Sequence, residues 1–285
     1  MAGNPTGQPI QRAFLYHADA NPVGGTINGN NIPSYASVSL PLAGGELKRR
    51  RTAPKEIMDD LVSYTSVSTH VIGRTQGDAW TTLVTATIKD LSILKVVTAK
   101  TVVAQLEVSH PQNGGEPIIS VFGSQFEGLK ISGVEIKPDI RYDLFSEHDG
   151  SSQKPAQKYP TKSWLEQAKF LEKVKSQRDN HEKTYAGLSS SVQQHFYKFA
   201  PAPVQNNDKY LVCSLIDELP VPQKLGVTLC GNGIYIPGYG KFFFGELIVQ
   251  HKTFTVSMVR AELGSANVGP VSAASVRSNG VPSGP

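Results

Sequence analysis

The most regular feature of the sequence is an alternation of apolar and small polar residues along several segments. It is clearest in SYASVSLPL (34–42), LVSYTSVSTHVIG (61–73) and AWTTLVTATI (79–88). A two-residue period is the pattern of a β-strand with one buried and one solvated face. Residues 74–78, between the last two segments, contain Gly77, so we predict a β-hairpin over residues 61–88.

Further segments rich in β-branched residues lie on both sides of a polar middle section. They are ILKVVTAK, TVVAQLEVSH, PIISVFGSQ, GLKISGVEI, KYLVCSLIDEL, VTLCG, GIYIPG, GKFFFGELIVQ, TFTVSMVRAEL and GPVSAASV. Gly, Pro or Asn interrupts them at short intervals, which is typical of β-sandwiches and barrels. The sequence therefore predicts a mainly β fold, an antiparallel two-sheet sandwich or a barrel-like form of it.

The strand pattern stops between residues 147 and 207. After a polar linker, Thr161 to about Arg178 has apolar residues at helical spacing, and Thr161 can cap the helix. The residues predicted to form the apolar face are Trp164, Leu165, Ala168, Leu171 and Val174. A second, shorter helix is expected over residues 189–199.

The two groups of strands are expected to form one domain, because each needs the other to bury a face. The 26 glycines and 19 prolines among 285 residues agree with a fold of many turns. The predicted parts are an arm (1–11), a single β domain (12–279) with a helical insertion at about 150–207, and a tail (280–285).

The glycine-rich stretch GNGIYIPGYGKFFFGELIVQ (231–250) raises the question of a phosphate site. Its glycines match neither GxGxxG nor GxxxxGK[ST], and the residues that follow predict a strand where a phosphate site needs a helix. We predict turns around a short strand at Ile234–Ile236, then a central strand over Phe242–Val249. Phe243 is expected to face the core, so Phe243→Ala would cost about 3–5 kcal/mol. An exposed Phe243 would mean that Phe242 and Phe244 face inward instead.

Charge and hydropathy narrow the function classes. The net charge is only +4, and the excess lies in residues 151–209, which contain ten Lys or Arg and five Asp or Glu. This is too mild to indicate nucleic-acid binding. The N-terminus has no apolar segment of signal-peptide type, and no segment approaches the ~18 apolar residues of a membrane helix. We expect a soluble chain, cytoplasmic at synthesis, and export by another route stays open.

Candidate metal and thiol sites are few. His17 and Asp19 form an HxD pair that a strand would place on one face, and Glu147, His148 and Asp149 form an acidic cluster that lacks the spacing of a calcium loop. Surface polar residues and a solvated linker are the plainer interpretations. Cys213 and Cys230 do not fit a zinc pattern. They are either two buried thiols on strands or a disulfide between neighbouring strands.

The sharpest charge run is Lys48–Arg49–Arg50–Arg51. Two interpretations are open: a solvated loop between strands, which is the plainer one, and a surface that binds an anionic partner or a phosphate backbone. No aromatic residues adjoin it for base stacking. We predict no catalytic residues and no cofactor, since no GxSxG or convincing SxxK motif is present.

The strand blocks resemble a known family. SYASVSLPLAGG, YTSVSTHVIG, WTTLVTATIKDLSILKVVTAKTVVAQLEVSHP, FGSQFEGLKISGVEI, GYGKFFFGELIV, FTVSMVRAELG and GPVSAASVRSNG look like blocks of a family of uncharacterised bacterial proteins. They are more distantly similar to the β-rich module of secreted surface proteins of the choice-of-anchor P type. The resemblance covers about Phe14–Phe145 and Val227–Asn279 and excludes the helical insertion. It implies a β fold and supplies no catalytic residues.

Three function hypotheses follow. The first is a non-catalytic structural or binding protein that acts through its surface and self-associates or binds a protein partner. The second is a membrane-active, pore-forming protein that uses the 61–88 hairpin, because each strand is long enough to cross a bilayer when tilted. The third is a hydrolase whose site the sequence does not reveal.

Overall fold

The predicted hairpin over residues 61–88 is the centre of the first of two sheets. The computed structural model describes residues 14–52, 61–145, 159–193, 210–222, 225–264 and 266–282. In it, β7 (Ser66–Gln76) and β8 (Ala79–Ile93) pair antiparallel from Ser66↔Lys89 to Gln76↔Ala79. Gly77 in the tight turn has φ +61°, a conformation that L side chains rarely adopt. The hairpin prediction is confirmed.

The first sheet has the strand order β13-β12-β9-β8-β7-β5, and every pairing in it is antiparallel. Strands β10 and β11 also pair with β9, and β6 pairs with β8. Its remaining strands are β5 (Gly45–Thr52), β6 (Val62–Ser63), β9 (Val97–Pro111), β10 (Ile118–Ser120), β11 (Gln125–Glu127), β12 (Lys130–Ile131) and β13 (Val134–Glu135).

The second sheet has the order β15-β16-β17-β18-β19-β2-β3, with β14 paired to β17 and β4 to β2. Its strands are β2 (Ala18–Ile27), β3 (Asn30–Asn31), β4 (Val38–Ser39), β14 (Tyr210–Ser214), β15 (Thr228–Cys230), β16 (Gly233–Ile236), β17 (Gly240–Gln250), β18 (Thr253–Leu263) and β19 (Gly269–Ser278). A small ribbon of β1 (Phe14–Leu15) and β20 (Val281–Pro282) lies at one end. The strand predicted over residues 34–42 is wrong in extent, because only β4 forms there.

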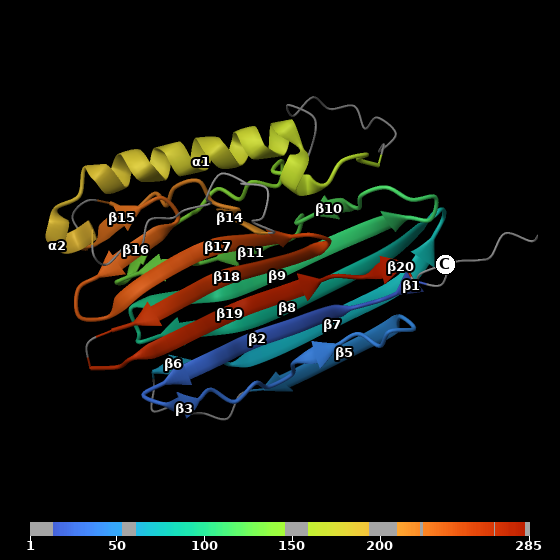
Figure 1. Ribbon diagram of the computed structural model, residues 1–285. Helices are drawn as coiled ribbons and strands as arrows, with labels where there is room; N and C mark the ends of the chain where they lie inside the picture. The colour runs from blue at the N-terminus through green and yellow to red at the C-terminus, as the bar shows by residue number, and fades with distance from the viewer. Residues whose placement is uncertain are drawn as a thin grey trace, which may run out of the picture.

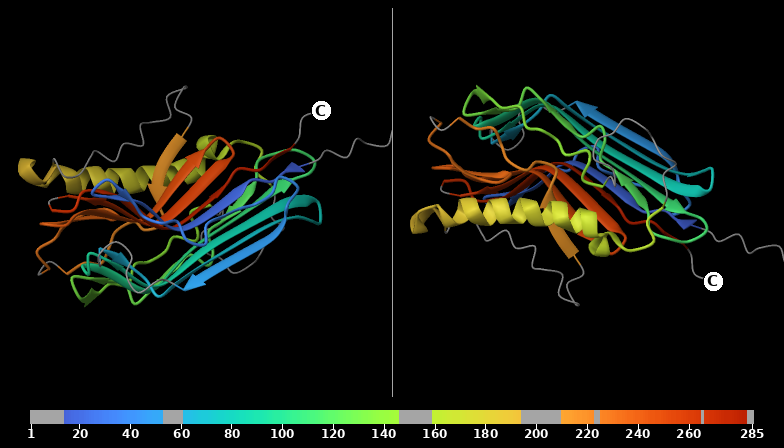
Figure 2. Two further views of the ribbon diagram at one scale, coloured as in Figure 1. Left: turned by 90° about the horizontal axis from the view of Figure 1, so that it is seen from below. Right: turned by 90° about the horizontal axis from the view of Figure 1, so that it is seen from above.

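The two sheets pack face to face as the two layers of a sandwich (Figure 2). The inward residues of the first sheet, such as Val84, Ile88 and Leu106, are fully buried against those of the second, such as Phe244 and Val256. Alternate residues face solvent, which explains the polar–apolar alternation of the sequence. Neither sheet closes on itself, so the sandwich prediction is confirmed and the barrel-like form is not adopted.

The pairing of the second sheet skips one residue on each of its four central strands. The skipped residues are Gly245, Met258, Ala274 and Pro22, and all are buried. Gly245 has φ +65° and Ala274 has φ +49°. The four residues lie side by side across the sheet. On each strand, the core-facing positions shift by one residue from one side of this row to the other. On β17, Phe242 and Phe244 face the core before it, and Leu247 and Val249 face the core after it.

The prediction that Phe243 faces the core is wrong. The strand prediction over Phe242–Val249 is confirmed by β17, but the core-facing residues are Phe242 and Phe244. Phe243 is buried on the opposite face, where the guanidinium of Arg260 lies 4.1 Å from the centre of its ring. Phe243 is therefore sheltered by a cation–π contact on the outer surface of the sheet rather than by the core.

The helical insertion is confirmed, with different boundaries. A 3₁₀ turn, η1 (Trp164–Glu166), is capped by Ser163 rather than Thr161, and α1 runs over Ala168–Ala186. Its buried residues are Phe170, Val174 and His181, whereas Ala168 is exposed. A short helix α2 (Ser190–Gln193) follows, and the rest of the predicted 189–199 helix lies outside the described residues. In the part of the chain that the structure describes, no helix combines the length and apolar character needed to span a membrane.

Helix α1 lies alongside the border of the second sheet formed by β14 and β15 (Figure 1). Phe170 stacks on Phe145 at 5.3 Å and meets Trp164 edge-on at 5.7 Å. The indole nitrogen of Trp164 donates to the carbonyl of Pro117 at 2.8 Å. These contacts anchor the insertion to both sheets, because Pro117 directly precedes β10 of the first sheet.

Candidate functional site

Charged or reactive side chains gather at the junction between α1 and β14, at the pair His181 and Cys230 beside it, and along the exposed strand β5. Two of the sequence-predicted sites, the His17–Asp19 pair and the basic run Lys48–Arg51, lie within the described residues.

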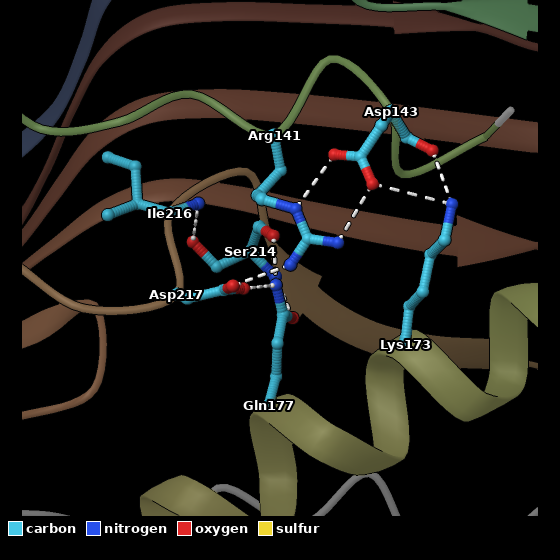
Figure 3. A network of polar contacts seen from close by, with 7 residues as sticks. All are labelled: Arg141, Asp143, Lys173, Gln177, Ser214, Ile216 and Asp217. Atoms are coloured by element: carbon cyan, nitrogen blue, oxygen red, sulfur yellow. Dashed lines mark hydrogen bonds and ion pairs between the residues drawn. The ribbon is translucent and has the colours of Figure 1, made fainter. Parts of the chain in front are cut away.

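The junction is built around Arg141, in the loop that follows β13 (Figure 3). Its guanidinium donates two parallel hydrogen bonds to the carboxylate of Asp143, from Nε at 2.8 Å and from Nη2 at 3.0 Å. Nη1 donates to Asp217 at 2.5 Å. The bonds from Arg141 lower the pKa of Asp143 to about 2. A carboxylate held in this way stays charged at neutral pH and cannot exchange protons there.

Helix α1 completes the junction. Lys173 Nζ donates to the Asp143 carbonyl at 2.6 Å, and Gln177 Nε2 donates to the Ser214 carbonyl at 2.8 Å and to Asp217 at 2.6 Å (Figure 3). In return, the backbone N–H of Ser214 donates to Gln177 Oε1 at 3.2 Å. Gln177 thus pairs with the end of β14 as a further strand residue would. The junction therefore holds helix α1 against the second sheet.

The hydroxyl of Ser214 is used in the same way. It lies 3.0 Å from the Phe244 carbonyl and 3.1 Å from the Gly245 carbonyl, and it accepts the N–H of Ile216 at 2.9 Å. Asn232 also donates to the Phe244 carbonyl, at 2.9 Å. These bonds satisfy the backbone where β17 skips a residue. The hydroxyl is thus engaged by backbone groups, which is a structural use rather than that of an activated nucleophile.

His181 and Cys230 form a buried pair between α1 and β15. The thiol sulfur lies 3.5 Å from Nε2 and 3.6 Å from Nδ1 of the ring. Burial raises the pKa of Cys230 to about 12 and lowers the pKa of His181. A nucleophilic thiolate needs the opposite shifts. The cavity beside the pair measures about 20 Å³, room for a single water molecule. The pair is therefore unsuited to nucleophilic catalysis.

The cysteine prediction is settled in favour of two buried thiols. Cys213 on β14 and Cys230 on β15 are both free and buried, and the disulfide alternative is wrong. Burial also raises the pKa of Cys213.

The predicted metal pair is only partly assembled. His17 Nε2 lies 3.8 Å from Asp19 Oδ2, but Nδ1 contacts Asn279 and Asp19 accepts a hydrogen bond from Ser39 at 2.6 Å. Nowhere in the described ranges do three or more His, Cys, Asp or Glu residues gather to hold a metal ion. The other candidates, Glu147, His148 and Asp149, lie outside the described residues.

The basic run forms β5, the last strand of the first sheet. The interpretation as a loop is wrong, because Lys48, Arg49, Arg50 and Arg51 pair with His70, Thr69, Ser68 and Val67 of β7. Lys48 meets Glu46 at 2.6 Å, and the Arg51 guanidinium lies 3.9 Å from the centre of the Tyr35 ring. Arg49 and Arg50 are exposed and make no ion pair with any described residue.

A groove opens beside this strand. Its volume is about 360 Å³, and its lining combines cationic, imidazole and hydroxyl groups. The lining residues are Lys48, Arg49, Arg50, Ser68, Thr69, His70, Thr85 and Thr87. His70 donates to or accepts from Glu46 at 2.8 Å, so Glu46 occupies one end of the charged row. A basic groove floored by hydroxyls can hold a carboxylate or another oxyanion.

The basic run is evident in the sequence, but the junction around Arg141 is not. Its members lie far apart in the sequence, with Arg141 and Asp217 separated by 76 positions. One local signal was present: Lys173, Gln177 and His181 recur every four residues, next to the predicted apolar face of the helix. Polar residues at that spacing lie on one side of a helix, but a solvated face has the same spacing, so the sequence alone does not identify the contact.

Comparison with known proteins identifies one family for this chain. A family model described as "Domain of unknown function (DUF8256)" matches residues 14–250. No curated protein and no solved structure matches the chain significantly. The match spans most of the chain, from β1 to the end of β17 and including the helical insertion. The chain therefore belongs to this family, Domain of unknown function (DUF8256).

Proposed function

We propose that the protein is a non-catalytic binding protein that holds an anionic partner on strand β5. One observation carries the proposal: Arg49 and Arg50 are exposed on an open strand and make no ion pair with any described residue. Exposed cations gathered on one strand raise the local potential and attract anionic groups. The adjoining groove of about 360 Å³ adds hydroxyl donors to the same surface.

The chemistry of the two clusters beside helix α1 supports a non-catalytic role. The charged groups of the α1–β14 junction satisfy one another, and Asp143 keeps its charge at neutral pH. The thiol of Cys230 and the ring of His181 are both held neutral by burial. Catalytic sites shift pKa values toward the working pH, whereas these groups are shifted away from it.

The charge on β5 favours a partner of opposite charge over a second copy of the chain. If two copies paired through β5 in antiparallel fashion, Lys48–Arg51 would face the same run. Like charges directly opposite one another weaken strand pairing. The strands that end the order of the two sheets elsewhere, β13, β15 and β3, have only two or three residues each in the described part of the chain. The five-residue β14, which pairs with β17, meets α1 at its end, where Gln177 bonds to Ser214. These edges offer little length for self-association by strand pairing.

The membrane-active alternative gains no support from the arrangement of the hairpin. Strands β7 and β8 sit in the middle of the first sheet, between β5 and β9. Their inward residues, including Val71, Val84 and Ile88, are fully buried in the core. Insertion of this hairpin into a bilayer would dismantle the sandwich.

The proposal is tested by neutralising β5. We compare the Lys48→Gln/Arg49→Gln/Arg50→Gln/Arg51→Gln variant with a control that loses the same charge elsewhere, at the exposed Lys137, Lys162, Lys175 and Lys183. Retention on immobilised polyglutamate and on heparin is measured at rising salt. Loss of retention in the β5 variant alone supports the proposal. Equal loss in both variants, or no retention of the parent protein, contradicts it.

A further inference from the structure

We infer that the anionic partner is an acidic peptide segment that binds by adding a further strand to β5. The inference rests on the proposed function and names the partner and its mode of binding. It depends on three features of β5: its open edge, the distribution of its charge over two faces, and the groove on the outer face.

Strand β5 ends the first sheet with a long edge (Figure 1). It has eight residues, all paired with β7 on one side. On its other side, no backbone hydrogen bond joins it to another described segment. Alternate residues of an antiparallel strand turn their N–H and C=O groups away from the neighbour. An edge of this length can therefore accept an extended peptide as a new strand.

The four cations of β5 are divided between the two faces of the sheet. Lys48 and Arg50 stand opposite His70 and Ser68, on the outer face. Arg49 and Arg51 point the other way, as does their neighbour Thr69, which is 2% exposed. A polyanion lying flat on the outer face would meet only half of this charge. An added strand with consecutive acidic residues would place carboxylates opposite cations on both faces.

The groove gives the outer face a place for a side chain. Hydroxyls of Ser68, Thr85 and Thr87 line it together with Lys48 and Arg50. In strand addition, backbone pairing provides the binding and recesses for alternate side chains provide the selectivity. A carboxylate projecting from the added strand would find cationic and hydroxyl donors there. On the other face, Arg51 covers the Tyr35 ring, which leaves that ring unavailable for stacking with a base.

Basic residues on an open edge have a second effect, which the experiment must separate from binding. Charges on an edge strand discourage pairing with other chains. These charges oppose pairing with apolar and basic strands, but they do not oppose pairing with an acidic strand. A purely protective edge would bind no acidic peptide, so the two interpretations differ in a measurable way.

The experiment uses the full chain and three probes. The first is a capped acidic peptide as long as β5, with Glu at its central positions and Val and Thr around them. The second is the same peptide with alternate amides N-methylated, which keeps the charge and removes the N–H donors of one edge. The third is a sulfated oligosaccharide. Binding is measured by calorimetry, and hydrogen exchange of the amides of residues 45–52 is followed in parallel.

We expect the first peptide to bind and to slow exchange over residues 45–52. N-methylation should weaken binding roughly tenfold or more, because strand addition depends on backbone donors. Arg49→Gln/Arg50→Gln should weaken it roughly tenfold, and Arg49→Glu/Arg50→Glu should transfer the preference to the matching Lys peptide. Lys137→Gln is the control variant, and thermal unfolding verifies that each variant is folded.

The remaining outcomes separate the inference from the proposed function. If both peptides bind equally, or only the oligosaccharide binds, strand addition is wrong and anion binding by β5 stands. If the first peptide binds without protecting residues 45–52, its site is elsewhere and the inference fails. If no anionic probe binds, both statements are overturned and β5 is a protected edge.

Discussion

The two sheets of this sandwich end in opposite ways. The second sheet ends near α1, where Gln177 bonds to the end of β14 and the Arg141–Asp143–Asp217 cluster is internally paired. The first sheet ends in β5, whose eight residues include four adjacent cations and are covered by none of the described helices. Charged residues serve both ends. At the covered border they bind one another and hold the fold together, whereas at the open border Arg49 and Arg50 are exposed and make no ion pair with any described residue.

The largest loss of stability is expected when helix α1 is loosened from the border of the second sheet that it covers. Phe170→Ala removes the 2%-exposed ring that holds α1 against Phe145 and Trp164. Truncation of a buried Phe costs about 3–5 kcal/mol of unfolding free energy. Denaturant unfolding measures the loss, and hydrogen exchange should become faster in β14. Lys175→Ala, on the exposed side of α1, is the control and should change stability by less than about 0.5 kcal/mol.

The free energy of unfolding is expected to depend on pH, by about 3 kcal/mol, through a histidine at the end of the first sheet that the β1–β20 ribbon covers. His110 on β9 is buried under Phe14, whose ring centre lies 5.0 Å away, and its Nε2 has no hydrogen-bond partner among the described residues. Burial, with a smaller contribution from Lys252, lowers the pKa of His110 from 6.5 to about 4. Between these two values the unfolded chain binds a proton that the folded chain does not bind, so stability falls as pH falls.

The contribution of His110 to the pH dependence of stability is measured by replacing its side chain. Stability, measured by urea unfolding between pH 7 and pH 4, should fall less steeply in His110→Leu than in the parent protein. His251→Gln, which removes an exposed imidazole, should leave the slope unchanged. A slope in His110→Leu equal to that of the parent would show that other groups carry the acid sensitivity.

The Arg141 cluster offers a smaller test of the closed border. Arg141→Gln removes three charge-assisted hydrogen bonds and should cost about 2 kcal/mol. Because Arg141 lowers the pKa of Asp143 from 3.8 to about 2, the stability it provides is present above pH 3.8 and is lost as pH falls toward 2. In Arg141→Gln, urea unfolding should show no such fall in stability between pH 3.8 and pH 2. Lys137→Gln, whose exposed Nζ lies 3.7 Å from Glu135, should have almost no effect on stability.

The hairpin of β7 and β8 was predictable from the sequence because its pairing is regular, although β8 and β9 skip Asp90 and Lys100 further along. Strands β7 and β8 pair without a skipped residue over their shared length, so alternation in the sequence maps directly onto inside and outside. The second sheet changes phase at Gly245 and Ala274, and nothing in the local composition distinguishes Ala274 from an ordinary strand residue. The prediction that Phe243 faces the core failed for this reason.

The candidate site was half predictable. The run Lys48–Arg51 is evident in the sequence, but it has no apolar alternation, because both faces of β5 are largely exposed. A strand pattern depends on one buried face, so the run resembled a loop. That β5 forms an open edge follows only from its pairing with β7 and from the absence of a further strand in the described sheet, which are long-range properties.

The smallest effect on stability, and the largest on binding, is expected at the open border. Arg49→Gln/Arg50→Gln removes two exposed charges without described ion pairs, so the free energy of unfolding should change by less than about 0.5 kcal/mol. In the same variant, retention on an acidic matrix at low salt should fall clearly, since the potential at β5 falls with each charge removed. Arg260→Gln is the informative contrast: it breaks the 2.8 Å bridge to the buried Glu246 and uncovers Phe243, so it should destabilise the fold while leaving anion binding by the folded protein unchanged. If Arg49→Gln/Arg50→Gln instead unfolds the protein as readily as Arg260→Gln does, these cations are structural, and the contrast between the two borders disappears.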